Sequence, residues 1–224
     1  MGVKERQERE RETVARAILD AARDLFISHG YQEVSIRKIA ERIEYSPAAI
    51  YSYFPSKDDI FFALAEEGFR LLFSYAEVPP GPPDEDPANR ILRQFWRYYE
   101  FSKDHPEYFA LMFLDRTVPR ISENWERFGL VSEKKHDMLV GIQQAIDAGA
   151  FPRGTTPHAV FHIVLAAIHG VAAMNLCDRM SPAEDADVLA RATLNTVITG
   201  LKAGAALDLA LPECPESFNE DQQS

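Results

Sequence analysis

The stretch from Ser35 to Lys57, SIRKIAERIEYSPAAIYSYFPSK, constrains the fold more than any other part of the sequence. Its first half repeats apolar residues at three- and four-residue steps, which predicts one amphipathic helix. These residues are Ile36, Ile39, Ala40 and Ile43. Ser35 can cap this helix, and Ser46 can cap a second one that starts at Pro47, where a missing N–H is tolerated. The second helix runs to Phe54 and stops before a proline. Two short helices joined by a tight turn form a helix-turn-helix.

The same stretch resembles the DNA-binding region of tetracycline-repressor (TetR) family transcription regulators, over about residues 13–69. The matching residues are Ile39, Ala40, Ser46, Ile50, Tyr51, Phe54, Lys57 and Ile60. The chain departs from the family pattern at Ile43-Glu44-Tyr45, where Ala-Gly-Val is usual, and at Ala48, which is often Gly. Glu44 occupies the turn position that glycine commonly fills. If its backbone is left-handed, the non-glycine residue costs about 1 kcal/mol.

The resemblance implies an all-α homodimer that binds a palindromic double-stranded DNA operator and responds to a small-molecule inducer. Repression is the usual outcome in the family, and activation stays open. We expect residues 1–57 to form the helix-turn-helix DNA-binding domain. Residues 58–206 then form the larger helical ligand-binding and dimerisation domain, and residues 207–224 a disordered tail.

The resemblance also assigns roles within the helix-turn-helix. Small residues let its second helix enter the major groove, where Pro47, Ala48 and Ser52 would face the bases. Tyrosine hydroxyls and helix N-termini would contact phosphate oxygens; for Tyr51 the alternative is a packed tyrosine with a satisfied hydroxyl. The predicted DNA-binding residues are Ser35, Arg37, Lys38, Ser46, Pro47, Ala48, Tyr51, Ser52, Tyr53 and Lys57.

The net charge of −11 is unusual for a protein that binds DNA, but the charge is unevenly distributed. Residues 1–57 carry ten Lys or Arg and nine Asp or Glu, so the acidic excess lies outside them. Binding must therefore come from a local basic patch rather than from the overall field. The charged run at residues 1–12 is either a solvated tail or an arm whose basic residues touch phosphate or the minor groove. Those basic residues are Lys4, Arg6, Arg9 and Arg11.

The other sequence signals favour a cytoplasmic protein. Cys177 and Cys214 fit neither a metal spacing nor a disulfide framework. The N-terminal segment has no apolar core typical of a signal peptide, and no run approaches 18 apolar residues, so no membrane span is expected.

Helical periodicity continues along the rest of the chain, and no stretch alternates as a strand does. The predicted helices lie at about residues 14–29, 57–73, 91–99, 107–114, 125–146, 158–180 and 181–201, with a proline-rich loop at 77–87. Small residues along the helix at 158–180, among them Ala166 and Gly170, allow close approach of another helix. Together with the final helix they predict a two-fold interface, or else ordinary internal packing.

Aromatic and histidine side chains of the larger domain are candidates for an inducer pocket, with burial in the core as the alternative. They are Phe95, Tyr98, Tyr99, Phe109, Met112, Phe113, Trp125, Phe128, His162 and His169. His162 and His169 are seven residues apart and should share a face of their helix. Without a carboxylate partner they predict no metal site, and no resident cofactor is expected.

The sequence offers little for catalysis. Glu133 and His136 form an E-x-x-H unit, but the second copy that a di-iron bundle needs is missing. No phosphate-binding loop or activated nucleophile motif occurs. Two alternatives to a DNA-binding regulator stay open. One is a ligand-binding or interaction module of the same fold with little DNA affinity, and the other is an all-α enzyme that depends on His162 or His169.

Overall fold

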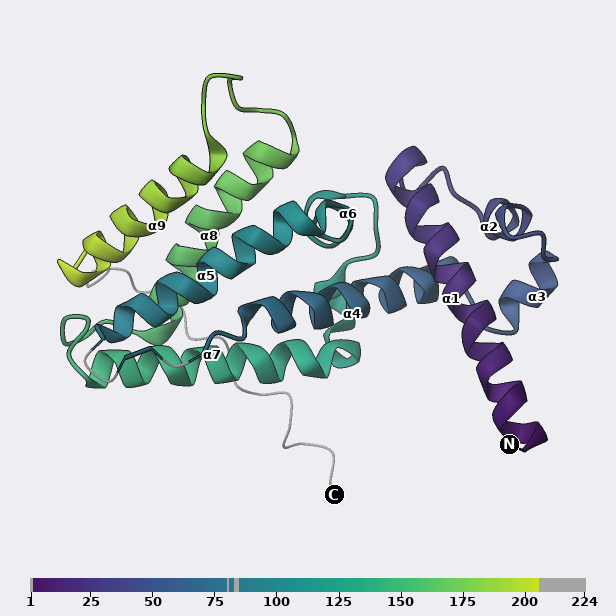
Figure 1. Cartoon of the computed structure of the whole chain (residues 1–224), viewed down its shortest axis with the longest axis horizontal. Helices are drawn as coiled ribbons and strands as arrows, with labels where there is room; N and C mark the ends of the chain where they lie inside the picture. The colour runs from purple at the N-terminus through teal and green to yellow at the C-terminus, as the bar shows by residue number, and fades with distance from the viewer. Residues whose placement is uncertain (1, 80, 83–84, 206–224) are drawn as a thin grey trace.

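The computed structural model describes residues 2–79, 81–82 and 85–205, without the side chains of Val3, Ser122 and Trp125, and it is helical throughout that part of the chain. The predicted tail at 207–224 and Cys214 lie outside the described residues. Figure 1 shows two groups of helices, a small one at the N-terminus and a larger one, with α4 reaching from the first into the second. We refer to them as the head (α1 to α3) and the body (α5 to α9).

The head contains α1 (Val3–His29), α2 (Ile36–Arg42) and α3 (Pro47–Tyr51). Both predicted caps are confirmed: the Ser35 hydroxyl accepts from the Lys38 amide at 3.2 Å and the Ser46 hydroxyl from the Ala49 amide at 3.1 Å. Three fully buried isoleucines, one from each helix, hold the head together by removing apolar surface from water. They are Ile18, Ile39 and Ile50.

The residues before and after α3 set the turns of the head. Glu44 has φ 59°, so the condition considered from the sequence is met: the backbone is left-handed at a residue that is not glycine. The predicted extent of α3 was too long, since the helix ends at Tyr51 rather than Phe54. The Ser52 hydroxyl donates to the Ala49 carbonyl at 2.7 Å, a side-chain contact that competes with continuation of the helix.

Helix α4 (Lys57–Ala76) begins after the Ser56 cap and connects the head to the body. Twenty residues of helix extend about 30 Å, so one rod carries contacts with both groups. It packs on α1 of the head and on α5 and α6 of the body. Gly68 has no side chain, so the Met112 sulfur packs directly against the α4 backbone at this position.

The body surrounds α5, which packs against α4, α8 and α9. Its elements are α5 (Pro87–Asp104), α6 (Pro106–Phe109), one π-helical turn η1 (Ala110–Leu114), a 3-10 segment η2 (Ile121–Phe128), α7 (Gly129–Asp147), α8 (Pro157–Leu176) and α9 (Ala186–Lys202). The predicted helix at 125–146 is therefore shorter, because a kink at Asn124 and 3-10 geometry precede Gly129.

The predicted boundary between the last two helices was wrong. Helix α8 ends at Leu176 rather than Met180, and left-handed Asp178 (φ 52°) turns the chain away. Helix α9 starts at Ala186 rather than at residues 181–182. The Asp185 carboxylate accepts from the Asp187 amide at 2.8 Å and the Val188 amide at 3.1 Å, which places the cap four residues later than expected.

Helix α8 also corrects the expectation about apolar runs, because it is long and apolar enough to cross a membrane. His158, His162 and His169 interrupt the apolar residues of this helix, so the sequence contains no continuous apolar run of that length. The helix packs against α5, α7 and α9, and only a third of its apolar window is buried within one chain. A core helix of a soluble protein passes the same length and composition test.

The left-handed backbone at Glu44 predicts a stability effect. Glu44→Gly should raise the free energy of unfolding by up to about 1 kcal/mol, because glycine adopts this conformation without a steric penalty. The matched control Glu41→Gly, inside α2, should lower it by about 1 kcal/mol. Urea unfolding of both variants measures the difference. A loss of stability in Glu44→Gly would contradict the assigned strain.

Candidate functional site

The exposed face of the helix-turn-helix is the first candidate site. Ile50 points into the core, so the opposite side of α3 faces solvent. Tyr51 is 53% exposed, which excludes the alternative of a tyrosine packed in the core. Of the predicted DNA-binding residues, those exposed are Ser35, Arg37, Lys38, Ser46, Pro47, Ala48, Tyr51 and Ser52, and those half-buried are Tyr53 and Lys57.

Three residues that the sequence prediction left out of the DNA-binding set border this face. Tyr45, in the turn before α3, is 45% exposed, and Arg42 at the end of α2 is also exposed. The Arg11 guanidinium of α1 lies 5.8 Å from the centre of the Tyr53 ring. Tyr45 could have been suspected from the sequence, because the family pattern has valine at this position. Arg11 was already among the basic residues of the segment at 1–12 that could touch DNA, but its contact with Tyr53 depends on the packing of α1 and had no signal in the sequence.

The Lys57 ammonium lies at the junction of head and α4. Its Nζ donates to the Tyr31 carbonyl at 2.8 Å and the Val34 carbonyl at 2.9 Å, and it lies 4.0 Å from the Tyr31 ring centre. Burial lowers the pKa of this ammonium. The Tyr31 hydroxyl in turn donates to Asp58. Two of the three Lys57 protons therefore attach α4 to the connection between α1 and α2, and phosphate binding by Lys57 stays a prediction.

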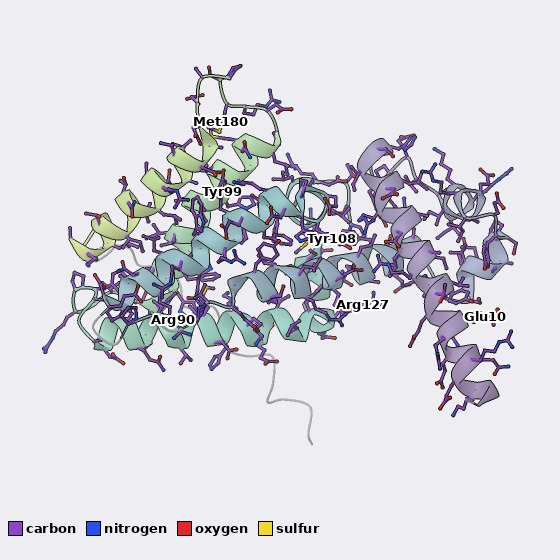
Figure 2. The ribbon with its side chains drawn as sticks, viewed as in Figure 1. Glu10, Arg90, Tyr99, Tyr108, Arg127 and Met180 are labelled. Carbon is purple, nitrogen blue, oxygen red and sulfur yellow. The ribbon has the colours of Figure 1, made fainter. Side chains whose placement is uncertain are left out.

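Polar contacts further join the head to the body. Arg127 donates to Asp59 at 2.8 Å, and Gln32 Nε2 donates to the Thr117 carbonyl at 2.9 Å. The Ser56 hydroxyl and then Arg127 hold the pKa of Asp59 below its usual range. Tyr108 and Arg127 both lie where the body meets α4 (Figure 2).

A second polar group joins α1, α4 and α6. The Tyr108 hydroxyl donates to Glu67 at 2.8 Å, and Arg16 donates to the same carboxylate at 2.7 Å. Arg23 reaches the Tyr108 hydroxyl at 3.4 Å. The orientation of α1 is thus linked to side chains of the body as well as to α4.

Part of the predicted inducer pocket forms a compact group in the body, which we call the Tyr98–His169 cluster: Tyr98, Phe109, Phe113 and His169. The Tyr98 hydroxyl lies 2.8 Å from His169 Nδ1, and the His169 ring stacks on Phe109 with centres 5.4 Å apart. Phe113 meets His169 edge to face at 5.8 Å. Burial lowers the pKa of His169 and raises the pKa of Tyr98, so both are neutral near pH 7.

The other predicted pocket residues lie elsewhere. Phe95 packs on Phe161, Phe128 packs on Phe69, and buried Met112 contacts α4. His162 is exposed and bonds to the His158 carbonyl rather than joining His169. The side chain of Trp125 lies outside the described residues. The candidate pocket residues predicted from the sequence therefore do not form one site but lie in several parts of the body.

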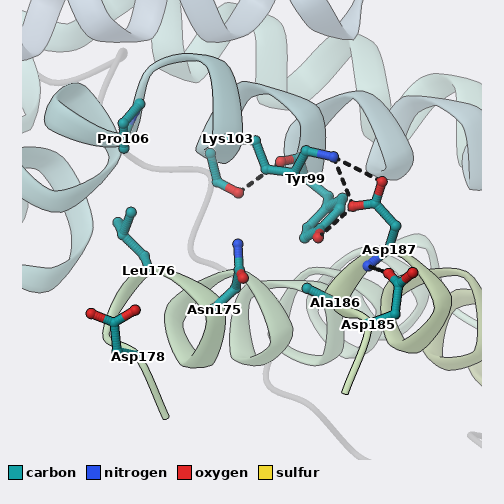
Figure 3. A pocket seen from close by; sticks show the side chains of 10 residues that line it. Tyr99, Lys103, Pro106, Asn175, Leu176, Asp178, Asp185, Ala186 and Asp187 are labelled. Carbon is teal, nitrogen blue, oxygen red and sulfur yellow. Dashed lines mark hydrogen bonds and ion pairs between the residues drawn. The ribbon is translucent and has the colours of Figure 1, made fainter. Parts of the chain in front are cut away.

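The structure also contains a surface cleft of about 470 Å³ between α5 and the facing ends of α8 and α9 (Figure 3). Tyr99 from the predicted list lines it. Its hydroxyl donates to Asp187 at 2.9 Å, and Lys103 donates to the same carboxylate at 2.7 Å. Lys103 is the main cause that holds the pKa of Asp187 low. Periodicity did not indicate this cleft because its residues come from four separate helices and from the loop between α8 and α9. In the part of the chain that the structure describes, no three His, Cys, Asp or Glu residues are grouped for a metal ion.

His169 predicts a pH effect on stability. Its pKa is lowered in the folded chain, so the unfolded chain binds more protons, and stability is lost as pH falls below about 6.5. His169→Gln should therefore show a smaller fall in Tm between pH 7.5 and pH 5.5 than the unchanged protein. His162→Gln, at an exposed position of the same helix, is the matched control and should keep the full fall. Equal behaviour of the two variants would contradict the assigned burial of His169.

Comparison with known proteins agrees with this architecture. A family model described as bacterial regulatory proteins, tetR family, matches residues 18–64, and one described as tetracyclin repressor-like, C-terminal domain, matches residues 92–197. The HTH-type transcriptional regulator Rv2912c of Mycobacterium tuberculosis is 30% identical over 157 residues, 67% of this chain and 76% of that protein.

Two further likenesses concern part of the chain and the fold. The HTH-type transcriptional repressor Rv1474c of Mycobacterium tuberculosis is 44% identical over 52 residues, 23% of this chain and 28% of the repressor. The chain thus spans little more than a quarter of that relative. The crystal structure of the TetR family regulator PfmR from Thermus thermophilus has a TM-score of 0.59 at 19% identity, covering 82% of this chain and 98% of PfmR. At that identity the likeness shows the fold alone.

Proposed function

Because the chain belongs to the tetR family of bacterial DNA-binding transcriptional regulators, we propose that it is a cytoplasmic repressor that a small-molecule inducer releases from its operator. Residues 1–57 bind DNA, and residues 58–206 hold the inducer and the dimer interface. The observation that carries the proposal is the exposed face of α3, where a capped helix presents Pro47, Ala48 and Tyr51 to solvent. Family membership points to a non-enzymatic transcription factor, and no catalytic role is proposed.

The DNA contacts divide into two kinds. Ala48 and Ser52 are small, so the α3 backbone can approach the base edges of the major groove. The Tyr51 hydroxyl and the amide end of α2 beside Ser35 bind phosphate oxygens and set the register. Arg37 is 80% exposed and pairs only with exposed Glu41, a pair weak enough to open for phosphate.

The uncovered face of α8, with part of α9, supports a homodimer. Ala166, Gly170 and Met174 of α8 are exposed, and Val188 of α9 is 62% exposed. A Cβ built on Gly170 meets no atom within 4 Å, so another helix can approach it closely. A two-fold pairing of α8 and α9 buries these apolar residues and presents two heads. Heads in successive major grooves are about 34–36 Å apart, which requires a palindromic operator.

We assign the inducer site to the Tyr98–His169 cluster. It combines three aromatic rings with one hydrogen-bonded polar pair, which suits an apolar ligand carrying one donor or acceptor. Phe113 from this cluster also meets Phe69 of α4 edge to face at 6.0 Å. A ligand that separates the packed rings therefore presses on the helix that carries the head.

Release then follows as a population shift. Lys57 and Asp59 attach the first turn of α4 to the head and the body, so a tilt of α4 changes the spacing of the two heads. An inducer that binds the spacing unsuited to DNA more tightly lowers the population that can bind DNA. Operator binding is then weakened by the coupling free energy between the two sites.

Operator binding is tested by selecting duplexes from a random library and measuring fluorescence anisotropy on the winner. We expect a palindrome whose affinity falls steeply with salt. Tyr51→Phe should weaken binding to all sequences alike, by about 1 kcal/mol per head, because it removes a phosphate contact. Ala48→Val should instead change which bases are preferred.

The reverse pattern of the two variants would contradict these roles. Failure to enrich any duplex at low salt, with co-purified ligand removed, would favour the alternative of a ligand-binding module with little DNA affinity.

Coupling through α4 is tested at Gly68. A Cβ there would lie 2.3 Å from the Met112 sulfur and 3.0 Å from Tyr108 Cδ1, so Gly68→Ala must shift these side chains and disturb the contact between α4 and the body. We expect operator affinity to fall several-fold while the flexible Met112 limits the stability loss to about 1–3 kcal/mol. Gly141→Ala in α7, where the added Cβ meets no atom within 4 Å, is the control and should leave DNA binding unchanged. Equal operator affinities in the two variants would rule out the coupling.

A further inference from the structure

The first turns of α1 continue its buried face beyond the core of the head. Seven residues are nearly two helical turns, so residues at that spacing lie in one row along the helix. One row contains Lys4, Arg11, Ile18 and Leu25, of which Ile18 is fully buried and Leu25 packs against the core. The row is thus apolar inside the head and basic where the helix runs past it. Lys4 and Arg11 are both exposed.

The position of Arg11 shows which way this basic part of the row faces. Its guanidinium lies over the ring of Tyr53, the second residue after α3 ends. Lys4 is seven residues further along, about 10 Å toward the N-terminus. Figure 1 shows this end of α1 projecting beyond α3. Lys4 and Arg11 therefore extend the face of the head that presents α3.

The charges of Lys4 and Arg11 are available for a partner. No carboxylate pairs with either of them within the described residues, whereas Arg16, Arg23 and Arg37 are all paired. The residues that follow them, Glu5 and Glu12, each point about 100° away around the helix. Within residues 1–12 the four basic and four acidic residues interleave around the helix, and Glu8 is the acidic residue closest in direction to Lys4 and Arg11.

We propose that Lys4 and Arg11 bind backbone phosphates of the DNA flanking each operator half-site. This inference rests on the proposed function, and it identifies α1 as a second DNA-contacting element. Lys4 and Arg11 are single charges without a base-reading partner, so they add affinity and salt dependence rather than sequence preference. Glu8 lies one turn from both residues and opposes the same contact.

The test compares two double variants with equal charge loss. K4Q/R11Q removes the proposed face, and R6Q/R9Q removes two basic residues that point elsewhere. Both are measured by anisotropy against the selected operator, as a duplex with six flanking base pairs on each side and as a trimmed core. Circular dichroism confirms equal helix content.

We expect K4Q/R11Q to bind the flanked duplex at least tenfold more weakly, with a salt slope smaller by up to about 3.6 for four lost contacts in a dimer. It should bind the trimmed core as the unchanged protein does. R6Q/R9Q should match the unchanged protein on both duplexes, and Glu8→Gln should bind the flanked duplex more tightly.

Equal losses in the two double variants, or an unchanged slope in K4Q/R11Q, would overturn the proposal while leaving the helix-turn-helix function intact. Loss of selective duplex binding by the unchanged protein would overturn the proposed function first, and this inference with it.

Discussion

The attachment of α4 to the head is the contact on which the rest of the structure depends. Lys57 places a half-buried ammonium between the Tyr31 and Val34 carbonyls, so the start of α4 and the connection between α1 and α2 form one unit. A buried cation with two good acceptors is costly to leave unpaired, which makes this link stronger than an exposed ion pair. In the proposed mechanism, a movement of α4 in the body is therefore transmitted to the head through this link.

Side chains of the body pack closely on α4 and connect it to its neighbours. Phe113 of η1 packs on Phe69 of α4, and Met112 packs against the α4 backbone at Gly68. Tyr108 donates to Glu67 of α4, which also binds Arg16 of α1. In the proposed mechanism, a ligand that separates the rings of the Tyr98–His169 cluster shifts α4 to another discrete arrangement, because close-packed rings do not deform gradually. The contact between Asp59 and Arg127 also links the first turn of α4 to η2.

What the sequence predicted is largely local. The caps at Ser35 and Ser46 depend on a few neighbouring residues, and the structure contains both. The all-α class followed from periodicity in the same way. The end of α3 depended on one hydroxyl, that of Ser52, which no pattern distinguishes from an exposed serine.

Tertiary contacts could not be predicted. Gln32 and Thr117 are far apart in the chain, and nothing near either residue signals their bond. His162 and His169 lie seven residues apart on one helix but in different surroundings. His169 packs against Phe109 of α6, Phe113 of η1 and Tyr98 of α5, whereas His162 is exposed. The largely uncovered face of α8 has a consequence of a different kind. If that face is stable only when paired, folding is linked to association, and the free energy of unfolding grows with protein concentration. The rate of proteolysis in the cell then depends on protein concentration. At low concentration the chains are unpaired and are degraded quickly, and at high concentration pairing slows their degradation.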